Sequence, residues 1–293
     1  MFMADNQTPR IADPARTREI MAQYHLRPKK SLGQNFLTNG RVLAEIVAAA
    51  DLTPADAVIE IGPGIGALTQ YLAEAARHVT AFELDQRLLP VLQDTLHDYP
   101  NVTIVHQDIL DAAPAQLAAL APELNIVANL PYYVTTPILM HFLESGLPIR
   151  RMVMMMQKEV ADRITADPGS KAYGSLSIAV QIRAQATVAF TVSHTAFNPP
   201  PKVDSAVVVF DFLTDPLVPL TEQPFFNKVV TACFAQRRKT IMNNLLNWYG
   251  RTPEHRATLT AALSHAGVAP TARAETVSIP AYRALSEKLQ PQK

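Results

Sequence analysis

The chain has 293 residues, of which 48% are hydrophobic and 18% charged, enough for a full core in one large domain or two unequal ones. Its 26 basic and 26 acidic side chains cancel, which argues against a strongly basic nucleic-acid-binding protein. The single cysteine, Cys233, excludes an internal disulfide framework and a CxxC metal site. Neither a membrane span of ~18 apolar residues nor the apolar core of a signal peptide is evident, so we expect a cytoplasmic protein with no membrane partner.

The charges are distributed unevenly along the chain. Residues 1–50 carry 7 basic and 4 acidic side chains, residues 51–150 carry 3 and 12, and residues 151–293 carry 16 and 10. An acidic middle is therefore flanked by two basic segments. Because basic surfaces attract polyanions, the flanks are candidate contacts for nucleic acid, although charge also varies along chains that bind none.

The first part of the chain predicts a loose tail over residues 1–16, a short helix over 17–24, an ordered loop over 27–37 and a helix over 42–50. From residue 57, short apolar runs alternate with amphipathic stretches, which predicts βαβ units and a parallel sheet covered on both faces. The predicted strands are 57–61, 78–83, 102–107, 124–130, 151–157, 186–192 and 205–212. The predicted helices between them are 66–76, 86–97, 112–121 and 136–145.

The Pro-rich stretch FNPPPKVD joins the last two predicted strands and suits an antiparallel pair at the sheet edge. After Pro219 we expect only helices, over 224–248, 253–266 and 280–289. These patterns predict an α/β fold with a Rossmann-like, mostly parallel seven-stranded sheet and a small C-terminal all-helical domain. The predicted divisions are an extension over 1–26, the α/β domain over 27–215 and the helical domain over 216–293.

The strongest local signal is VIEIGPGIGALT, in which Gly62, Gly64 and Gly66 follow a predicted strand and precede a helix. Glycines there permit a tight turn and let backbone N–H groups approach a ligand. Glu83 ends the next strand, where a carboxylate can accept hydrogen bonds from ribose hydroxyls. GxGxxG spacing is typical of nicotinamide cofactors, whereas GxGxG is similar to the signature for S-adenosylmethionine. A glycine-rich turn without a ligand is the alternative.

Two further strand ends carry candidate site residues. Asp108 can accept the amine of a cofactor adenine, or it simply caps a helix. The fourth strand ends in Asn129-Leu130-Pro131-Tyr132. The N6 amine of a substrate adenine is a poor nucleophile, and the Asn129 side chain and the Leu130 carbonyl can accept its two hydrogens and expose the lone pair. Pro131 stiffens the turn and Tyr132 offers a face for stacking; an ordinary turn with an Asn cap is the alternative.

With these motifs in place, the chain resembles the ribosomal RNA adenine N6,N6-dimethyltransferases that act on bacterial 16S rRNA, over about residues 20–290. The matching stretches are KKSLGQNFL (29–37), IEIGPGIGALT (59–69), FELD (82–85), QDIL (107–110), NLPYYVTTPIL (129–139), MMMQKEVADRI (154–164), YGSLSIAVQ (173–181), FNPPPKVDSAVV (197–208) and FAQRRKTIMNNL (234–245).

The resemblance implies dimethylation of two adjacent adenosines near the 3′ end of 16S rRNA in the small (30S) ribosomal subunit, with a role in its biogenesis. It implies that Tyr132 and Phe197 sandwich the target adenine. The residues that it implies for binding S-adenosylmethionine are Asn35, Leu37, Gly62, Glu83, Asp108 and Asn129, with Gly64 in the same turn. We expect a monomer, because the parallel sheet is interior and no exposed heptad is evident.

Basic clusters on both sides of these motifs predict RNA contacts, because Arg and Lys hold phosphates without specifying sequence. A merely solvated face is the alternative. The predicted RNA-binding residues are Arg27, Lys29 and Lys30 near the N-terminus and Arg237, Arg238 and Lys239 in the helical part.

Three other functions share some of these features. A nicotinamide dehydrogenase has the glycine turn and Glu83 but neither GxGxG spacing nor NLPY. A resistance methyltransferase of 23S rRNA has the catalytic motifs, although the match to FNPPPKVDS and QRRKT argues against it. A non-enzymatic checkpoint of ribosome assembly is compatible with the same fold and basic surface.

Overall fold

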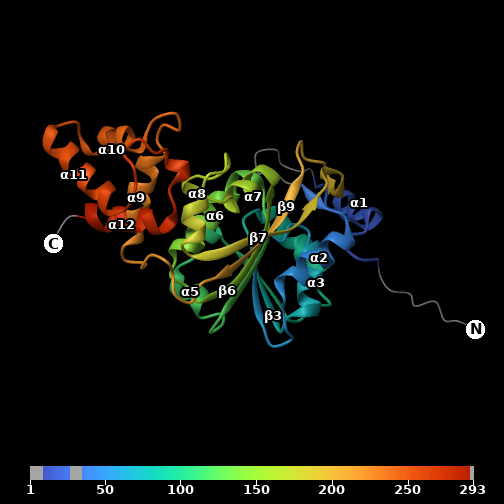
Figure 1. The fold of residues 1–293 in the computed structure, drawn as a ribbon. Coiled ribbons are helices and arrows are strands. Elements are labelled where there is room, and N and C mark those ends of the chain that lie inside the picture. The colour runs from blue at the N-terminus through green and yellow to red at the C-terminus, as the bar shows by residue number, and fades with distance from the viewer. Residues whose placement is uncertain (1–8, 27–34, 291–293) are drawn as a thin grey trace, which may run out of the picture. The chain divides into compact units, whose positions relative to one another are not determined.

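The computed structural model describes residues 9–26 and 35–290 (Figure 1). The chain divides into two compact units. The first unit comprises Met1–Lys158 and Thr187–Asp211, and the second comprises Glu159–Ala186 and Phe212–Lys293. The second unit thus contains residues 159–186 in addition to the C-terminal helices. The sequence predicted a single boundary after residue 215.

The central sheet, most of which belongs to the first unit, has seven strands in the order β4-β3-β2-β5-β6-β9-β7. The pairs from β4 through β6 are parallel, and β9 pairs with β6 in the antiparallel sense. This arrangement is the predicted α/β fold. The strands are β2 (Ala57–Ile61), β3 (His78–Glu83), β4 (Val102–His106), β5 (Leu124–Asn129), β6 (Ile149–Gln157), β7 (Ala184–Val192) and β9 (Ser205–Phe212).

The innermost strands β2 and β5 are almost wholly buried, as expected for parallel strands covered on both faces. Helices connect the strands, and a short antiparallel pair joins β1 (Phe36–Leu37) to β8 (Phe197–Asn198). The helices of the first unit are α1 (Pro14–Gln23), α2 (Gly40–Ala50), α3 (Ala67–Ala75), α4 (Leu89–Thr95), α5 (Pro114–Ala118) and α6 (Tyr132–Glu144), with short 3₁₀ turns at Gln86–Leu88, Ile109–Asp111 and His194–Ala196.

Residues 9–26 are more ordered than their polar sequence predicts. Ile11 and Ala12 are buried in the core of the first unit, and α1 begins at Pro14 and buries Ile20 completely. The Ile11 N–H donates to the side chain of Gln70 on α3. The prediction of a loose tail through residue 16 is therefore wrong for residues 9–16, because a few apolar side chains suffice to anchor the segment.

The second unit packs its helices around a core that contains Tyr173, Phe226 and Tyr282. The helix predicted over 224–248 is in fact two helices, because the chain leaves helical geometry at 234–240 and the Thr240 hydroxyl caps the next helix. The helices are α7 (Lys158–Ile164), α8 (Ser175–Gln181), α9 (Gln223–Cys233), α10 (Ile241–Tyr249), α11 (Pro253–His265) and α12 (Ile279–Leu289), with a 3₁₀ turn at Ala274–Thr276. Across the described ranges, no helix has the length and apolar character needed to cross a membrane.

Candidate active site

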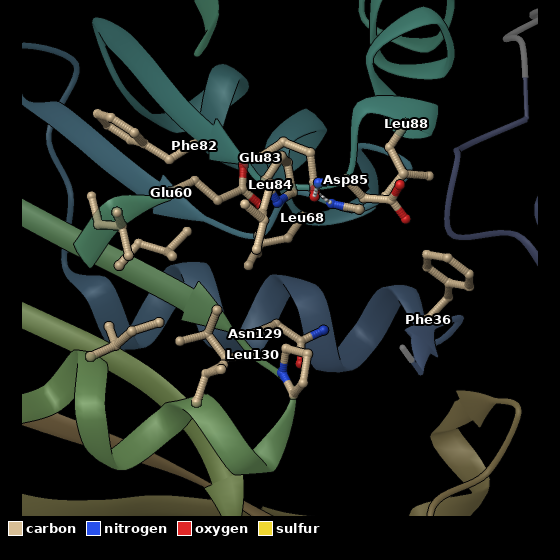
Figure 2. Close-up of a pocket in the computed structure, with 18 of the residues that line it drawn as sticks. Phe36, Glu60, Leu68, Phe82, Glu83, Leu84, Asp85, Leu88, Asn129 and Leu130 are labelled. Atoms are coloured by element: carbon tan, nitrogen blue, oxygen red, sulfur yellow. Dashed lines mark hydrogen bonds between the residues drawn. The ribbon is translucent and has the colours of Figure 1, made fainter. Parts of the chain in front are cut away.

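A cavity of about 170 Å³ lies at the carboxyl ends of β2, β3, β4 and β5 in the first unit. Its walls come from the turns that follow these strands, from Asn35–Leu37 and from Phe197. Figure 2 shows Glu60, Glu83 and Asn129 directed toward the cavity from neighbouring strands. This is the edge at which open α/β sheets bind ligands.

The glycine turn after β2 leaves space along one wall of the cavity. Gly62 and Gly64 have φ values of +71° and +63°, which L side chains rarely adopt. A Cβ on Gly62 would lie 3.3 Å from Leu130 Cδ2, and one on Gly64 would lie 3.4 Å from the Phe36 ring. The positive φ at both positions, together with the tight contact that a Cβ on Gly62 would make with Leu130, means that this turn requires glycine.

Glu83 holds this turn in place from the end of β3. Its side chain is buried, Oε2 accepts the Gly64 N–H at 3.2 Å, and Oε1 accepts the Asp85 N–H at 2.7 Å. Burial raises the pKa of Glu83, and the backbone N–H groups of Asp85 and Gly64 oppose that rise. Each carboxylate oxygen has a second lone pair, so Glu83 retains the capacity to accept hydroxyl hydrogens from a ligand.

Asp108 and Asn129 differ in how much of their bonding capacity the protein uses. Asp108 Oδ1 accepts the Leu110 N–H at 3.0 Å and so caps the following 3₁₀ turn, as the alternative interpretation expects. The same side chain also lines the cavity. Asn129, the last residue of β5, is half-buried, and its side-chain amide makes no hydrogen bond to any described residue. Asn129 is thus the lining group with the most unused hydrogen-bonding capacity at a strand end.

The two predicted stacking residues, Tyr132 and Phe197, both line the cavity. Tyr132 is the first residue of α6, and its hydroxyl lies 2.8 Å from Ser205 Oγ on β9. Partial burial raises the pKa of Tyr132. Phe197 is only 6% exposed and pairs with Leu37 across β1 and β8, so it is more enclosed than the sequence indicates.

Glu60 is a lining residue that the sequence analysis missed. It lies in β2, is 1% exposed, and neither carboxylate oxygen has a hydrogen-bond partner among the described residues. Its pKa is raised to about 8: burial is the main cause, the nearby Thr69 hydroxyl opposes the rise, and the charge of Glu83 adds to it. The carboxyl is therefore mostly protonated at pH 7. The available signal was an acid inside a strand expected to be buried on both faces.

Two large apolar side chains at the cavity were also missed. Leu84 directly follows Glu83 and is 55% exposed, and Leu110 follows the Asp108 turn and is 38% exposed. Both are unusually exposed for leucine and line the cavity wall. The signal in the sequence was a leucine one residue after Glu83 and another two residues after Asp108.

Of the predicted RNA-binding residues, the structure describes only Arg237, Arg238 and Lys239, which lie together on the surface of the second unit. Arg27, Lys29 and Lys30 lie outside the described residues. Arg237 Nη2 donates to the backbone carbonyls of Lys171 at 2.6 Å and Tyr173 at 3.1 Å within the second unit. The exposed side chains of Arg238 and Lys239, by contrast, make no hydrogen bond or ion pair with any described residue.

No group of three or more His, Cys, Asp or Glu side chains within the described ranges is arranged to hold a metal ion. The cavity offers instead carboxylates, an unpaired amide, aromatic rings and glycine backbone.

The family model for ribosomal RNA adenine dimethylase matches residues 25–290. The chain belongs to this family. Membership confirms the predicted fold class, the rRNA adenine methyltransferase activity and S-adenosylmethionine as the methyl donor.

Curated relatives in the ribosomal RNA adenine dimethylase family match nearly the whole chain. The "Ribosomal RNA small subunit methyltransferase A" of Latilactobacillus sakei is 55% identical, with 96% of each chain covered. The protein of the same name from Streptococcus pneumoniae is 50% identical over 97% of this chain and 99% of its own length.

Two solved structures resemble the dimethylase fold closely. The 23S rRNA methyltransferase ErmE has a TM-score of 0.67 and 33% identity, covering 87% of this chain and 99% of its own. A dimethyladenosine transferase from Plasmodium falciparum has a TM-score of 0.71 and 25% identity, covering 85% and 95% of the two chains.

Proposed function

We propose that this dimethylase transfers methyl groups from S-adenosylmethionine to N6 of two adjacent adenosines near the 3′ end of 16S rRNA, during biogenesis of the small subunit. The observation that carries the choice of substrate is identity of 50–55% over at least 95% of the chain with proteins named for the small subunit. Identity to the 23S rRNA methyltransferase ErmE is 33%. We extend the proposal to a monomeric cytoplasmic protein acting on the 30S particle.

The cavity fits S-adenosylmethionine, which supplies an electrophilic methyl group on a cationic sulfur when bound. In the proposal Glu83 accepts the ribose hydroxyls, and the second oxygen of Asp108 accepts the adenine amine. Leu84 and Leu110 cover the two faces of the cofactor adenine. Gly62 leaves room for the methionine part of the cofactor. Support comes from the hydrogen-bond capacity that these groups retain and from the space that a Cβ would fill. Asn35, Leu37 and Gly64 complete the proposed binding set.

The substrate adenine is proposed to enter beside Asn129. The Asn129 side-chain oxygen and the Leu130 carbonyl accept the two N6 hydrogens, which turns the nitrogen lone pair toward the methyl donor. Pro131 fixes the direction of this turn. Tyr132 stacks on the base with its hydroxyl held by Ser205, and Phe197 lies on the other side. The residues thus act by position and electrostatics, without a tuned general base.

The second methyl transfer places different demands on these residues. A monomethylated amine has only one N–H, so Asn129 and Leu130 cannot both accept a hydrogen from it. Stacking by Tyr132 and Phe197 therefore has to carry more of the positioning in the second step. We expect Tyr132→Ala to slow methylation of pre-monomethylated RNA more than that of unmodified RNA; an unchanged second step would contradict this division of labour.

The test of function compares substrates directly. Radiolabelled methyl incorporation is measured on unmodified 30S particles and on 23S rRNA, with Asn129→Ala as the inactive control. Incorporation into the two adjacent adenosines of 16S rRNA is expected. Incorporation into 23S rRNA alone would instead favour the second candidate, a 23S rRNA methyltransferase, which the likeness to ErmE supports.

A further inference from the structure

Residues of α9 and α10 in the second unit line a groove of about 520 Å³. The two helices are labelled in Figure 1. The two helices pack against each other, and their inward faces bury Phe226, Val230 and Leu245 in the core. Lys228 and Trp248 on the outward faces stay exposed. The groove is therefore a surface that the packing of the unit leaves uncovered.

The groove is lined by side chains suited to a nucleotide. No carboxylate lines it, although acids and bases are equally numerous in the chain. Asn227 supplies an amide that combines hydrogen-bond donors with an acceptor, as base edges do, and Asn247 supplies an NH₂ donor. Lys228 adds a positive charge. A protein helix docking here would need several apolar contacts, whereas Trp248 is the one large apolar residue of the lining.

Trp248 is placed to serve as a stacking surface. Its side chain is 41% exposed, and it is the only tryptophan of the chain. Its ring lies 6.3 Å from the Phe225 ring and 5.9 Å from the Tyr249 ring, both in tilted geometry. Aromatic neighbours thus hold the indole in place and leave part of it open. A stacked base meets this kind of surface on proteins that bind single-stranded nucleic acid.

The amides at the groove are oriented by their neighbours. Asn247 Oδ1 accepts a hydrogen bond from Arg251 Nη2, which leaves its NH₂ group to donate outward. Asn244 is 1% exposed, and its Nδ2 donates to the carbonyls of Cys233 at 2.6 Å and Gln236 at 3.1 Å. Through the Gln236 carbonyl the floor of the groove is joined to the turn that carries Arg238.

We propose that the α9–α10 groove binds one unpaired RNA nucleotide, with its base stacked on Trp248, its base edge against Asn227 and Asn247, and its phosphate near Lys228. The inference rests on the proposed rRNA substrate and deepens it, because it assigns the second unit to single-stranded rather than duplex RNA. Duplex RNA keeps its bases stacked inside and so cannot present one to the indole.

The single tryptophan allows a direct measurement on the intact protein. Intrinsic fluorescence is titrated with a short single-stranded oligoribonucleotide, with the same sequence as a duplex, and with S-adenosylmethionine alone. We expect quenching by the single strand and little change with the other two. Absence of quenching at concentrations where fluorescence anisotropy shows the labelled single strand bound would overturn the inference.

Variants separate stacking from folding. Trp248→Ala is expected to weaken single-strand binding at least about fivefold by anisotropy, and Trp248→Phe by less, since the ring is kept. Lys228→Gln is expected to reduce the salt slope of binding by about one. Leu220→Ala, which removes another exposed apolar side chain of the same unit, is the matched control. Equal affinities for all four variants and the unmodified protein would overturn the inference.

The proposed function can fail separately from the groove. Methyl incorporation into 30S particles by the unmodified protein is measured in parallel with the fluorescence titration. Methylation of 30S particles without quenching would overturn nucleotide binding in the groove and would support the proposed function. Quenching by the single strand without methylation of 30S particles would overturn the proposal that 16S rRNA is the substrate. It would still support the groove as an RNA-binding site.

Discussion

The buried carboxyl of Glu60 makes the stability of the first unit depend on pH. Its oxygens have no hydrogen-bond partner within the described part of the chain, and its pKa is raised from 4.5 to about 8, chiefly by burial. Replacing Glu60 with Gln removes the titration and keeps the shape. The comparison of the two proteins therefore isolates the free energy of ionising this one group inside the fold.

The sign and size of the change in the free energy of unfolding with pH follow from the pKa of Glu60 in the unfolded and folded states. The unfolded chain releases the proton near pH 4.5, whereas the folded protein keeps it until about pH 8. Between these values the folded state binds more protons, so the free energy of unfolding falls as pH rises, by ~1.4 kcal/mol per pH unit. The loss reaches about 3 kcal/mol at pH 7 and about 5 kcal/mol above pH 8. Below pH 4.5 both states are protonated and the effect disappears.

The assay is urea unfolding followed by far-UV circular dichroism, without cofactor, at several pH values between 5 and 8. The advantage of Glu60→Gln over the unmodified protein is expected to grow by about 1.4 kcal/mol per pH unit. Glu74→Gln serves as the control, because Glu74 is in an exposed ion pair with Arg10 and its substitution should produce a small, pH-independent change. A constant difference between Glu60→Gln and the unmodified protein across this range would refute the reasoning.

Three further outcomes are expected. Ser205→Ala removes the hydrogen bond that holds the Tyr132 hydroxyl, and should raise KM for RNA without changing the Kd of S-adenosylmethionine by calorimetry; a weakened cofactor Kd would contradict a role confined to the ring. Ile20→Ala should destabilise the first unit by about 2–5 kcal/mol in urea, and a loss under ~1 kcal/mol would show that α1 is not part of the core. Arg237→Ala should lower the thermal midpoint whereas Arg238→Ala should not, so equal midpoints would argue against the two carbonyl contacts.

The sheet could be predicted because each strand is a short apolar run, and the structure places all seven within a few residues of the expected bounds. Helices α7 and α8, of seven residues each, were not predicted from the sequence. What stabilises them is tertiary, for example the Ser177 hydroxyl donating to the Arg163 carbonyl at 2.5 Å. The break between α9 and α10 was missed because apolar residues keep helical spacing on both sides of it.

The candidate site was accessible to sequence reasoning for a similar reason. Residues that follow parallel strands meet at one sheet edge, so Gly62, Glu83, Asp108 and Asn129 could be grouped from their spacing alone. Glu60 was missed because its significance is that nothing bonds to it, which only the folded structure reveals. The sequence Arg237-Arg238-Lys239 likewise does not show that Arg237 is the residue whose side chain donates to backbone carbonyls within the protein.

The charge of the cavity constrains how the proposed RNA substrate approaches it. Four acidic side chains line the cavity, namely Glu60, Glu83, Asp85 and Asp108, and no basic side chain of the described residues does. With Glu60 protonated and Asp85 paired with Arg87, the carboxylates of Glu83 and Asp108 remain to attract a cationic cofactor and repel phosphate. We therefore expect the adenine of the proposed substrate to enter as an extruded base, with its phosphates outside the cavity. Affinity for S-adenosylmethionine should consequently vary little with salt, and affinity for RNA should fall steeply, since counterion release acts only on the latter.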